Sequence, residues 1–159
     1  MLKRVSIASL ALAAAICAAS AQEKSTDLAI VVAKASSFDN VSSLELLRIF
    51  EMEKSKDGDG HKLIVTARES NSPERAAALT TIYKMDDGEY QTYFLRAVFA
   101  GRASGKPQQL NSAAAVRRFV AATPGAIGYL LASDVDDSIK IVKVDGKAPG
   151  EAGYPLKAP

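Results

Sequence analysis

The chain has 159 residues, of which 48% are hydrophobic and 24% are charged, and its formal net charge is +2. This length and balance are typical of a single globular domain with a buried core, and they exclude collagen-like, disulfide-rich and disordered chains. One Cys and one His leave too few ligands for a haem or a thiolate metal site. We therefore expect neither a metal nor a cofactor.

The start of the chain has the pattern of a secretory signal peptide. Lys3 and Arg4 precede an uncharged apolar run, and Ala19-Ser20-Ala21 supplies the small residues of a cleavage site. A transmembrane anchor is the alternative, but the run is shorter than the roughly 20 apolar residues that span a bilayer. We predict a signal peptide over 1–21, a single domain over 22–159, and a location in the bacterial periplasm.

Removal of the signal peptide would leave a formally neutral chain. The segment contains two of the 20 basic residues, none of the 18 acidic residues, and the single cysteine, Cys17. A neutral chain offers little attraction to nucleic acid or to an acidic membrane surface. We therefore expect no nucleic-acid partner, and the predicted mature domain has no disulfide.

Short apolar runs alternate with amphipathic segments along the rest of the chain. Continuous apolar runs predict buried strands, and polar caps such as the Ser42–Glu45 capping box and Ser72-Pro73 predict helix starts. In chain order, the expected elements are a strand over 28–33, a helix after Ser42, a turn over 57–60, a strand over 63–66, helices from Ser72 and over 87–99, a loop over 101–109, a helix capped by Asn111 or Ser112, and strands over 126–130 and 139–144. This alternation predicts an α/β domain with a layered sheet.

Two of these helices have apolar stripes that we expect to face the core. The stripe of the helix from Ser72 consists of Ala76, Leu79, Ile82 and Tyr83. The stripe of the helix over 87–99 consists of Tyr90, Tyr93, Phe94 and Val98.

Residues for catalysis or metal binding are scarce. His61 is the only histidine, and the chain has no Gly-x-Ser-x-Gly motif for a nucleophilic serine. Asp57-Gly58-Asp59-Gly60 is similar to part of a calcium loop, but Thr66 stands where the bidentate Glu is required. We interpret this segment as a plain turn and predict that the protein is not an enzyme.

The stretch Arg68-Glu69-Ser70-Asn71-Ser72 is the strongest candidate for a binding site. It follows an expected strand and ends at a helix start, where free backbone N–H groups and the helix dipole favour an anion. The Arg68 guanidinium suits an oxyanion, and Ser70 and Ser72 add hydroxyl groups. The alternative is that Ser72 only caps the helix and that Arg68 pairs with a nearby carboxylate.

Several motifs in chain order are similar to those of one protein family. The most specific is Thr123-Pro124-Gly125-Ala126-Ile127-Gly128-Tyr129, and the segments over 28–32, 42–50, 144–149 and 154–156 accompany it. Together they resemble the phosphate-binding-protein branch of the periplasmic solute-binding proteins that serve ABC transporters. The resemblance covers nearly the whole mature chain. It implies a type II periplasmic-binding-protein fold, here a single lobe with a mixed sheet flanked by helices.

Two departures from the family pattern affect the expected site. The family's phosphate loop reads Arg, three residues, Ser, Gly, Thr; Arg68 and Ser72 match it, but Pro73 and Glu74 replace Gly and Thr. Proline removes a backbone donor, and Glu74 adds a negative charge that weakens anion binding unless it points away and only favours the helix start. The chain also has room for only about one of the family's two lobes. Short one-lobe relatives are similar in having Ser-Pro followed by an arginine, here Arg75.

Two functions stay open. In the first, which the resemblance implies, the protein binds phosphate or a similar oxyanion for ABC-type uptake or sensing, and its partner is an ABC transporter permease or a membrane sensor. The expected ligand-binding residues are Arg68, Ser70, Asn71, Ser72 and Arg75. In the second, the chain is a non-transport interaction module whose anion site has decayed. An exposed apolar patch would favour this second function or a homodimer.

Overall fold

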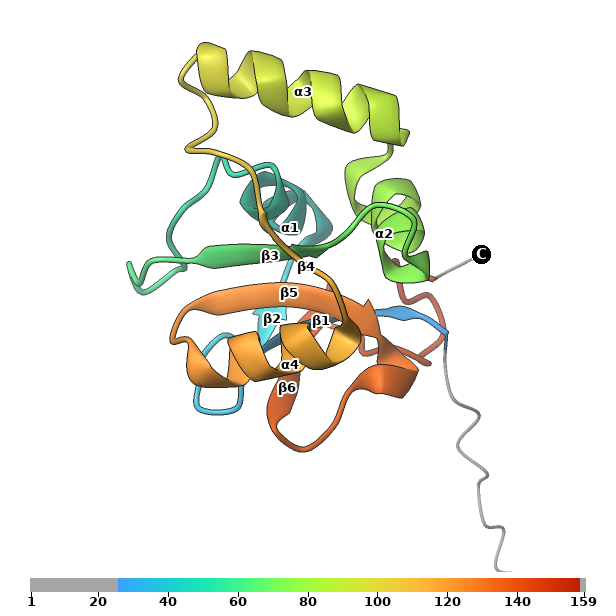
Figure 1. Cartoon of the computed structure of the whole chain (residues 1–159). Coiled ribbons are helices and arrows are strands. Elements are labelled where there is room, and N and C mark those ends of the chain that lie inside the picture. Colours follow the sequence, from blue (N-terminus) through green and yellow to red (C-terminus); the bar gives the residue numbers. More distant parts are fainter. Residues whose placement is uncertain (1–25, 158–159) are drawn as a thin grey trace, which may run out of the picture.

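The computed structural model describes residues 26–157, so the predicted signal peptide lies outside the described residues. These residues form a six-stranded sheet with helices against both of its faces (Figure 1). The strands are β1 (Leu28–Ala33), β2 (Asn40–Val41), β3 (Ile64–Arg68), β4 (Gln108–Leu110), β5 (Ala126–Leu131) and β6 (Ile139–Val144). The helices are α1 (Ser43–Phe50), α2 (Pro73–Ala78), α3 (Asp87–Phe99) and α4 (Ala113–Ala122). A π-helical turn, Leu79–Tyr83, continues α2, and a 3-10 turn, Ala132–Asp134, follows β5.

Strand β1 lies in the interior of the sheet. The strand order is β2-β6-β1-β5-β3-β4; β1 is antiparallel to both of its neighbours, and the other neighbouring strands pair in parallel. Its first five residues are buried, as a continuous apolar run predicts for a strand covered on both faces. The mixed sheet with helices on both faces confirms the predicted α/β fold class.

Alternate side chains of β1 belong to two separate cores, because successive residues of a strand point to opposite faces of the sheet. The larger core contains Leu28, Ile30 and Val32 together with side chains of α1, α2 and α3. The smaller core contains Ala29 and Val31 together with side chains of α4.

Helix α3 lies outside α1 and α2, as the outermost layer over one face of the sheet (Figure 1). It joins the larger core through aromatic side chains. The Tyr90 ring meets the Tyr83 ring edge to face at a centroid distance of 4.9 Å, and it also contacts Phe94 on the next turn of α3 at 4.7 Å. The other side of α3 is therefore the outer surface of this layer. Among the described residues, no helix is both long enough and apolar enough to cross a membrane.

The observed elements are close to the expected ones. The helix over 87–99 and the strands over 28–33 and 139–144 have the predicted bounds. Strand β3 is shifted, since it begins at Ile64 and continues to Arg68. The short strands β2 and β4 were not predicted. Strand β4, at the edge of the sheet, has the sequence Gln-Gln-Leu and no buried residue, so it has no apolar run by which it could be recognised.

The predicted apolar stripes are partly wrong. Ala76 is exposed, whereas Glu74 and Arg75 in the same helix are only 4% and 1% exposed. In α3, Val98 is exposed and Ala97 is buried in its place. Apolar periodicity could not identify Glu74 and Arg75 as inward-facing residues, because both are charged and are held inside by oppositely charged side chains.

Polar side chains cap the four α-helices. In each, the cap side chain accepts the backbone N–H three residues later; these caps are Ser42, Ser72, Asp86 and Ser112. The full reciprocal capping box forms at α3, between Asp86 and Glu89. At α1, Ser42 caps as predicted, but the reciprocal half of the predicted Ser42–Glu45 capping box is not formed, and the Glu45 carboxylate contacts Lys54 instead.

Two glycines of the Thr123–Tyr129 motif allow β5 to lie against β3. Gly125 has a φ of +80°, and a Cβ at this position would lie 2.1 Å from the carbonyl oxygen of Lys62. A Cβ at Gly128 would lie 2.3 Å from Thr66 Oγ1. Neither position has room for a side chain. The motif thus pairs β5 closely with β3, the strand that leads into the candidate site.

Candidate functional site

The candidate site begins where β3 ends and α2 starts. Arg68 is the last residue of β3, and its backbone N–H donates a 3.1 Å hydrogen bond to the Tyr129 hydroxyl on β5. The loop turns at Asn71, which has a left-handed φ of 71°. Ser72 Oγ then accepts the Arg75 N–H at 3.1 Å and donates to the Glu69 carbonyl at 3.0 Å. The Ser72 hydroxyl is therefore the helix cap, as the alternative interpretation predicts.

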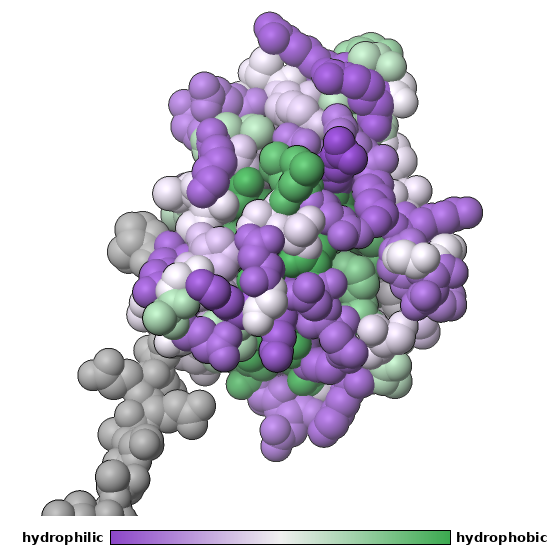
Figure 2. All heavy atoms as spheres, turned by 180° about the vertical axis from the view of Figure 1, so that it is seen from behind, coloured by the Kyte–Doolittle hydropathy of each residue, from purple (hydrophilic) through white to green (hydrophobic). Residues whose placement is uncertain are grey.

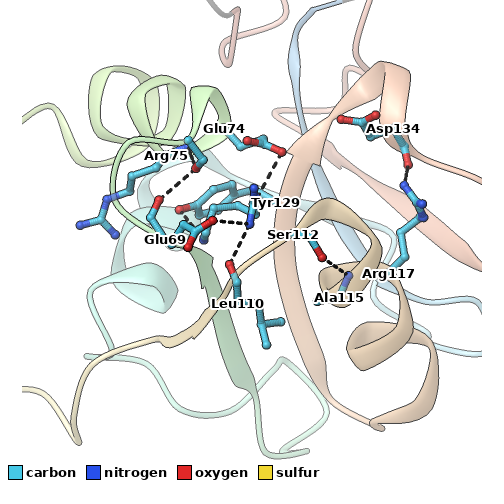
Figure 3. Close-up of polar contacts among 11 residues, drawn as sticks. Glu69, Glu74, Arg75, Leu110, Ser112, Ala115, Arg117, Tyr129 and Asp134 are labelled. Carbon is cyan, nitrogen blue, oxygen red and sulfur yellow. Dashed lines mark hydrogen bonds and ion pairs between the residues drawn. The ribbon is translucent and has the colours of Figure 1, made fainter.

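The Arg68 side chain is 9% exposed and is surrounded by acceptors from this chain. Its Nε lies 3.2 Å from Glu74 Oε1, and its Nη1 donates a 2.8 Å hydrogen bond to the Leu110 carbonyl on β4. The Glu69 carboxylate lies farther away, at 4.0 Å from Nη1, and is half exposed. Figure 3 labels Glu69, Glu74 and Leu110, the three residues that supply these acceptors.

Glu74 is the residue that most changes the expected site. The interpretation that it points away from the site is wrong, because its side chain is buried and its carboxylate contacts Arg68. Its second oxygen, Oε2, is buried and has no hydrogen-bond partner among residues 26–157. Glu74 follows Pro73 in the first turn of α2, and this turn places it above the end of β3. The carboxylate thus lies beside the arginine that an oxyanion would use.

Arg75 is buried on the other side of the loop. Its Nη2 lies 3.0 Å from Asp87 Oδ1, and its Cζ stacks 3.7 Å above the centre of the Tyr90 ring. Nε and Nη1 are buried without a hydrogen-bond partner among the described residues. Burial works against the charged form, yet Tyr90, Tyr129 and Asp87 around the guanidinium leave the pKa of Arg75 above its usual value. Arg75 is therefore a permanent positive charge beneath the loop.

A hollow of about 440 Å³ lies against this loop. It is lined by Ser70, Asn71, Ser72, Pro73, Arg75, Ala76, Leu79 and Asp87. Four of the five residues predicted to bind ligand thus share one hollow, while Arg68 does not line it and lies with Glu74 beside β4.

The hydroxyl of Tyr129, beneath the site, also has a shifted pKa. Burial raises the pKa of Tyr129 to about 12, so this hydroxyl stays protonated at neutral pH. It accepts the Arg68 backbone N–H and fixes the end of β3 against β5. Sequence reasoning assigned no role to Tyr129, the Leu110 carbonyl or Asp87. Glu74 and Asp87 each lie in the first turn of a helix, where acidic residues are preferred, but this preference does not predict which arginine each carboxylate contacts.

The turn predicted at Asp57–Gly60 is observed, and it brings three possible metal ligands together. The ligand atoms of Asp57, Asp59 and His61 all lie within 4.8 Å of one another. Asp57 accepts the backbone N–H groups of Asp59 and His61 and also contacts the His61 ring at 3.1 Å. These hydrogen bonds hold the turn itself, which agrees with the interpretation of the segment as a plain turn.

Several solved structures are similar to the chain, and the names of two of the three described below mention phosphate. An ABC-type phosphate transport receptor from Vibrio cholerae matches with a TM-score of 0.63 and 20% identity, over 77% of this chain and 48% of that one. A protein from Clostridium perfringens, described as a phosphate ABC transporter substrate-binding protein with bound phosphate, matches with a TM-score of 0.63 and 21% identity, over 77% and 46%. PstS from Borrelia burgdorferi matches with a TM-score of 0.60 and 15% identity, over 77% and 49%.

These matches establish the fold, which is the periplasmic-binding-protein fold expected from the motifs. The chain spans about half the length of the structures it matches, which agrees with the expectation of a single lobe. Two of these proteins are named as a transport receptor and a substrate-binding protein rather than as enzymes. No family model matches the chain.

Proposed function

We propose that this domain is a solute-binding lobe for a small tetrahedral oxyanion, with phosphate as the first candidate, at the junction of β3 and α2. The observation that carries the proposal is the pair of buried arginines that flank the Glu69–Asn71 loop in the chain: Arg75 lines a hollow together with Ser70, Asn71 and Ser72, and Arg68 lies next to this hollow, beside β4. Two fixed positive charges and a polar loop are what an oxyanion requires. The fold shared with phosphate receptors supports the same assignment.

The candidate residues have different roles in this proposal. Ser70 and Asn71 lie at the hollow and offer polar groups to the anion, and Arg75 supplies positive charge beneath them. The Ser72 hydroxyl is already used in both directions, so this residue shapes the loop. Arg68 binds the anion when it exchanges the Glu74 carboxylate for a ligand oxygen.

The proposed cellular role follows from the predicted export. A periplasmic lobe that binds an oxyanion would deliver it to an ABC transporter permease or report it to a membrane sensor. A single lobe leaves its ligand in contact with water, where charged hydrogen bonds are weakened. We therefore expect affinity for phosphate in the millimolar to high micromolar range, which suits a sensor better than a scavenging receptor.

Calorimetry tests the assignment. The chain without residues 1–21 is titrated with phosphate, with sulfate as the comparison anion, alongside Arg68→Ala and the control Arg117→Ala. Arg117 is a partly buried arginine on α4 that pairs with Asp136, outside the site. We expect saturable phosphate binding that Arg68→Ala abolishes and Arg117→Ala preserves. A folded protein that gives no heat at millimolar phosphate would refute the proposal.

The Arg68–Glu74 contact favours a second candidate function. A buried arginine that already has a carboxylate partner needs no ligand for its charge. In that case the domain is an interaction module that retains the fold and has replaced its anion by an internal carboxylate. The two candidates differ in one observable, because the module binds no phosphate even when Glu74 is neutralised.

A further inference from the structure

Helix α3 carries most of the large apolar side chains that are exposed among residues 26–157. Leu95, Val98 and Phe99 are 58%, 44% and 84% exposed, and the fourth such residue, Leu44, is on α1. Hydrophilic side chains predominate on the molecular face drawn in Figure 2. Since the opposite side of α3 is already packed in the core, the C-terminal half of α3 has large apolar side chains on both sides, and apolar side chains on both sides of a helix are normally covered.

The outward face of α3 has large side chains at one end and small side chains at the other. Gly88, Thr92, Leu95 and Phe99 are spaced by four, three and four residues, which places them on one face of the helix. A hollow of about 690 Å³ extends along this side of α3, from Gly88 and Thr92 at the small end to Arg96 and Arg102 at the other. Helix α3 thus has protruding apolar side chains, Leu95 and Phe99, and beside Gly88 and Thr92 it leaves space for side chains of this kind.

We propose that α3 docks onto α3 of a second copy of this chain, in antiparallel orientation about a two-fold axis. With the axis level with the middle of the helix, Phe99 of one copy lies opposite Gly88 of the other, and Leu95 lies opposite Thr92. Every contact along this face then joins a large side chain to a small one. A two-fold interface must be self-complementary in this way, because each copy contributes the same surface.

The charges on α3 select a second copy over other partners. Asp86 and Glu89 lie at the start of α3, Arg96 lies in its last turn, and Arg102 follows it. Antiparallel pairing brings the acidic start of one helix to the basic end of the other and opposes the two helix dipoles. In the register above, Asp86 lies near Arg102 of the other copy.

The contact is limited in size, and this sets the expected affinity. Helix α3 has 13 residues and is about 20 Å long. A single helix face buries less than the roughly 800 Å² per partner of a stable interface. We therefore expect a dimer that dissociates in the range of tens of micromolar and forms at the high local concentrations of an exported protein.

Sedimentation velocity between about 1 and 300 µM tests the proposal on protein expressed from the full sequence. We expect a concentration-dependent dimer whose dissociation constant rises at least tenfold in Phe99→Glu and in Gly88→Leu, which fills the receiving space. Leu44→Glu, which changes another exposed apolar side chain, on α1, serves as the control and leaves the dimer intact. A monomer at every concentration, or a dimer unaffected by Phe99→Glu, overturns the proposal.

Thiol cross-linking tests the register. Cys17, the only native cysteine, lies in the predicted signal peptide, so introduced cysteines can be read without background. Thr92→Cys lies close to the proposed axis and should give a covalent dimer with a short bis-maleimide, whereas Leu44→Cys should not. If the protein stays monomeric and instead binds phosphatidylglycerol vesicles in a Phe99-dependent manner, the surface contacts a membrane and the second copy is excluded.

Discussion

Neutralising Glu74 should open the site around Arg68. The two side chains are buried together, and Glu74 Oε1 lies 3.2 Å from Arg68 Nε. An oxyanion that binds Arg68 must compete with this carboxylate and then lie beside its negative charge. Glu74→Gln keeps the shape of the side chain and removes the charge. We expect the variant to bind phosphate more tightly than the parent protein.

The distances give the size of the effect. At 3.2 Å and an effective dielectric constant of about 20, the attraction between Arg68 and Glu74 is about 5 kcal/mol before the cost of burying both charges, which offsets much of it. A ligand anion about 5 Å from the Glu74 carboxylate is repelled by about 3 kcal/mol per unit charge under the same conditions. Even half of this repulsion corresponds to a dissociation constant about tenfold lower in Glu74→Gln.

The free energy of unfolding should also show that Glu74 and the ligand compete for Arg68. Without ligand, Glu74→Gln leaves the buried Arg68 charge with only the half-exposed Glu69 carboxylate, 4.0 Å away, as a charged partner, and we expect a loss of about 3 kcal/mol in the free energy of unfolding. Phosphate at 100 times its dissociation constant restores about 2.7 kcal/mol. For a domain of this size, the midpoint of thermal unfolding should then rise on the order of 10 °C with phosphate, and the rise should be smaller in the parent protein.

Thermal unfolding with and without phosphate, together with calorimetry, measures both effects. Glu69→Gln is the matched control, because Glu69 is the other carboxylate near Arg68 but lies 4.0 Å away and is half exposed. It should change phosphate affinity by less than threefold. A folded Glu74→Gln that binds phosphate no more tightly than the parent protein would show that the internal carboxylate does not compete with a ligand.

Two further predictions concern the scaffold. Gly125→Ala should lower the free energy of unfolding in denaturant by about 3 kcal/mol or more, because Gly125 has a positive φ and an added Cβ would lie 2.1 Å from the Lys62 carbonyl oxygen. Gly58→Ala is the control and should change the free energy of unfolding little, because Gly58 lies in open space. If the two variants lost the same stability, the close approach at Gly125 would not be the cause. The Asp145 carboxylate accepts hydrogen bonds from the Ser43 hydroxyl and N–H, which lower its pKa. Its stabilisation is therefore present above about pH 4 and lost as the pH falls below the lowered pKa, so Asp145→Asn should lower the unfolding midpoint at pH 7 but not near pH 2. An effect that is the same at both pH values would exclude this reason.

The sequence by itself determined the elements whose stabilisation is local or depends on apolar pattern. The buried run of β1, the cap at Ser72 and the bounds of α3 follow from residue order, because apolar runs and helix caps act within a few residues. The motif around Gly125 and Gly128 carried the family resemblance, and its glycines are required where β5 approaches β3. The fold class was therefore predicted correctly from the chain alone.

Tertiary structure decided which charges meet. Arg68 and Glu74 are six positions apart, yet their contact depends on how the loop turns at Asn71 and on how α2 packs above the end of β3. The apolar pattern of a sequence predicts that charged residues lie at the surface, so it did not predict that Glu74 and Arg75 are buried or that Ala76 is exposed. From the sequence, Glu74 either points away from the site or weakens anion binding, and the pattern of residues does not decide between these two alternatives. Burial of a charge depends on a partner placed by the fold, and this distance in space is not encoded in the local order of residues.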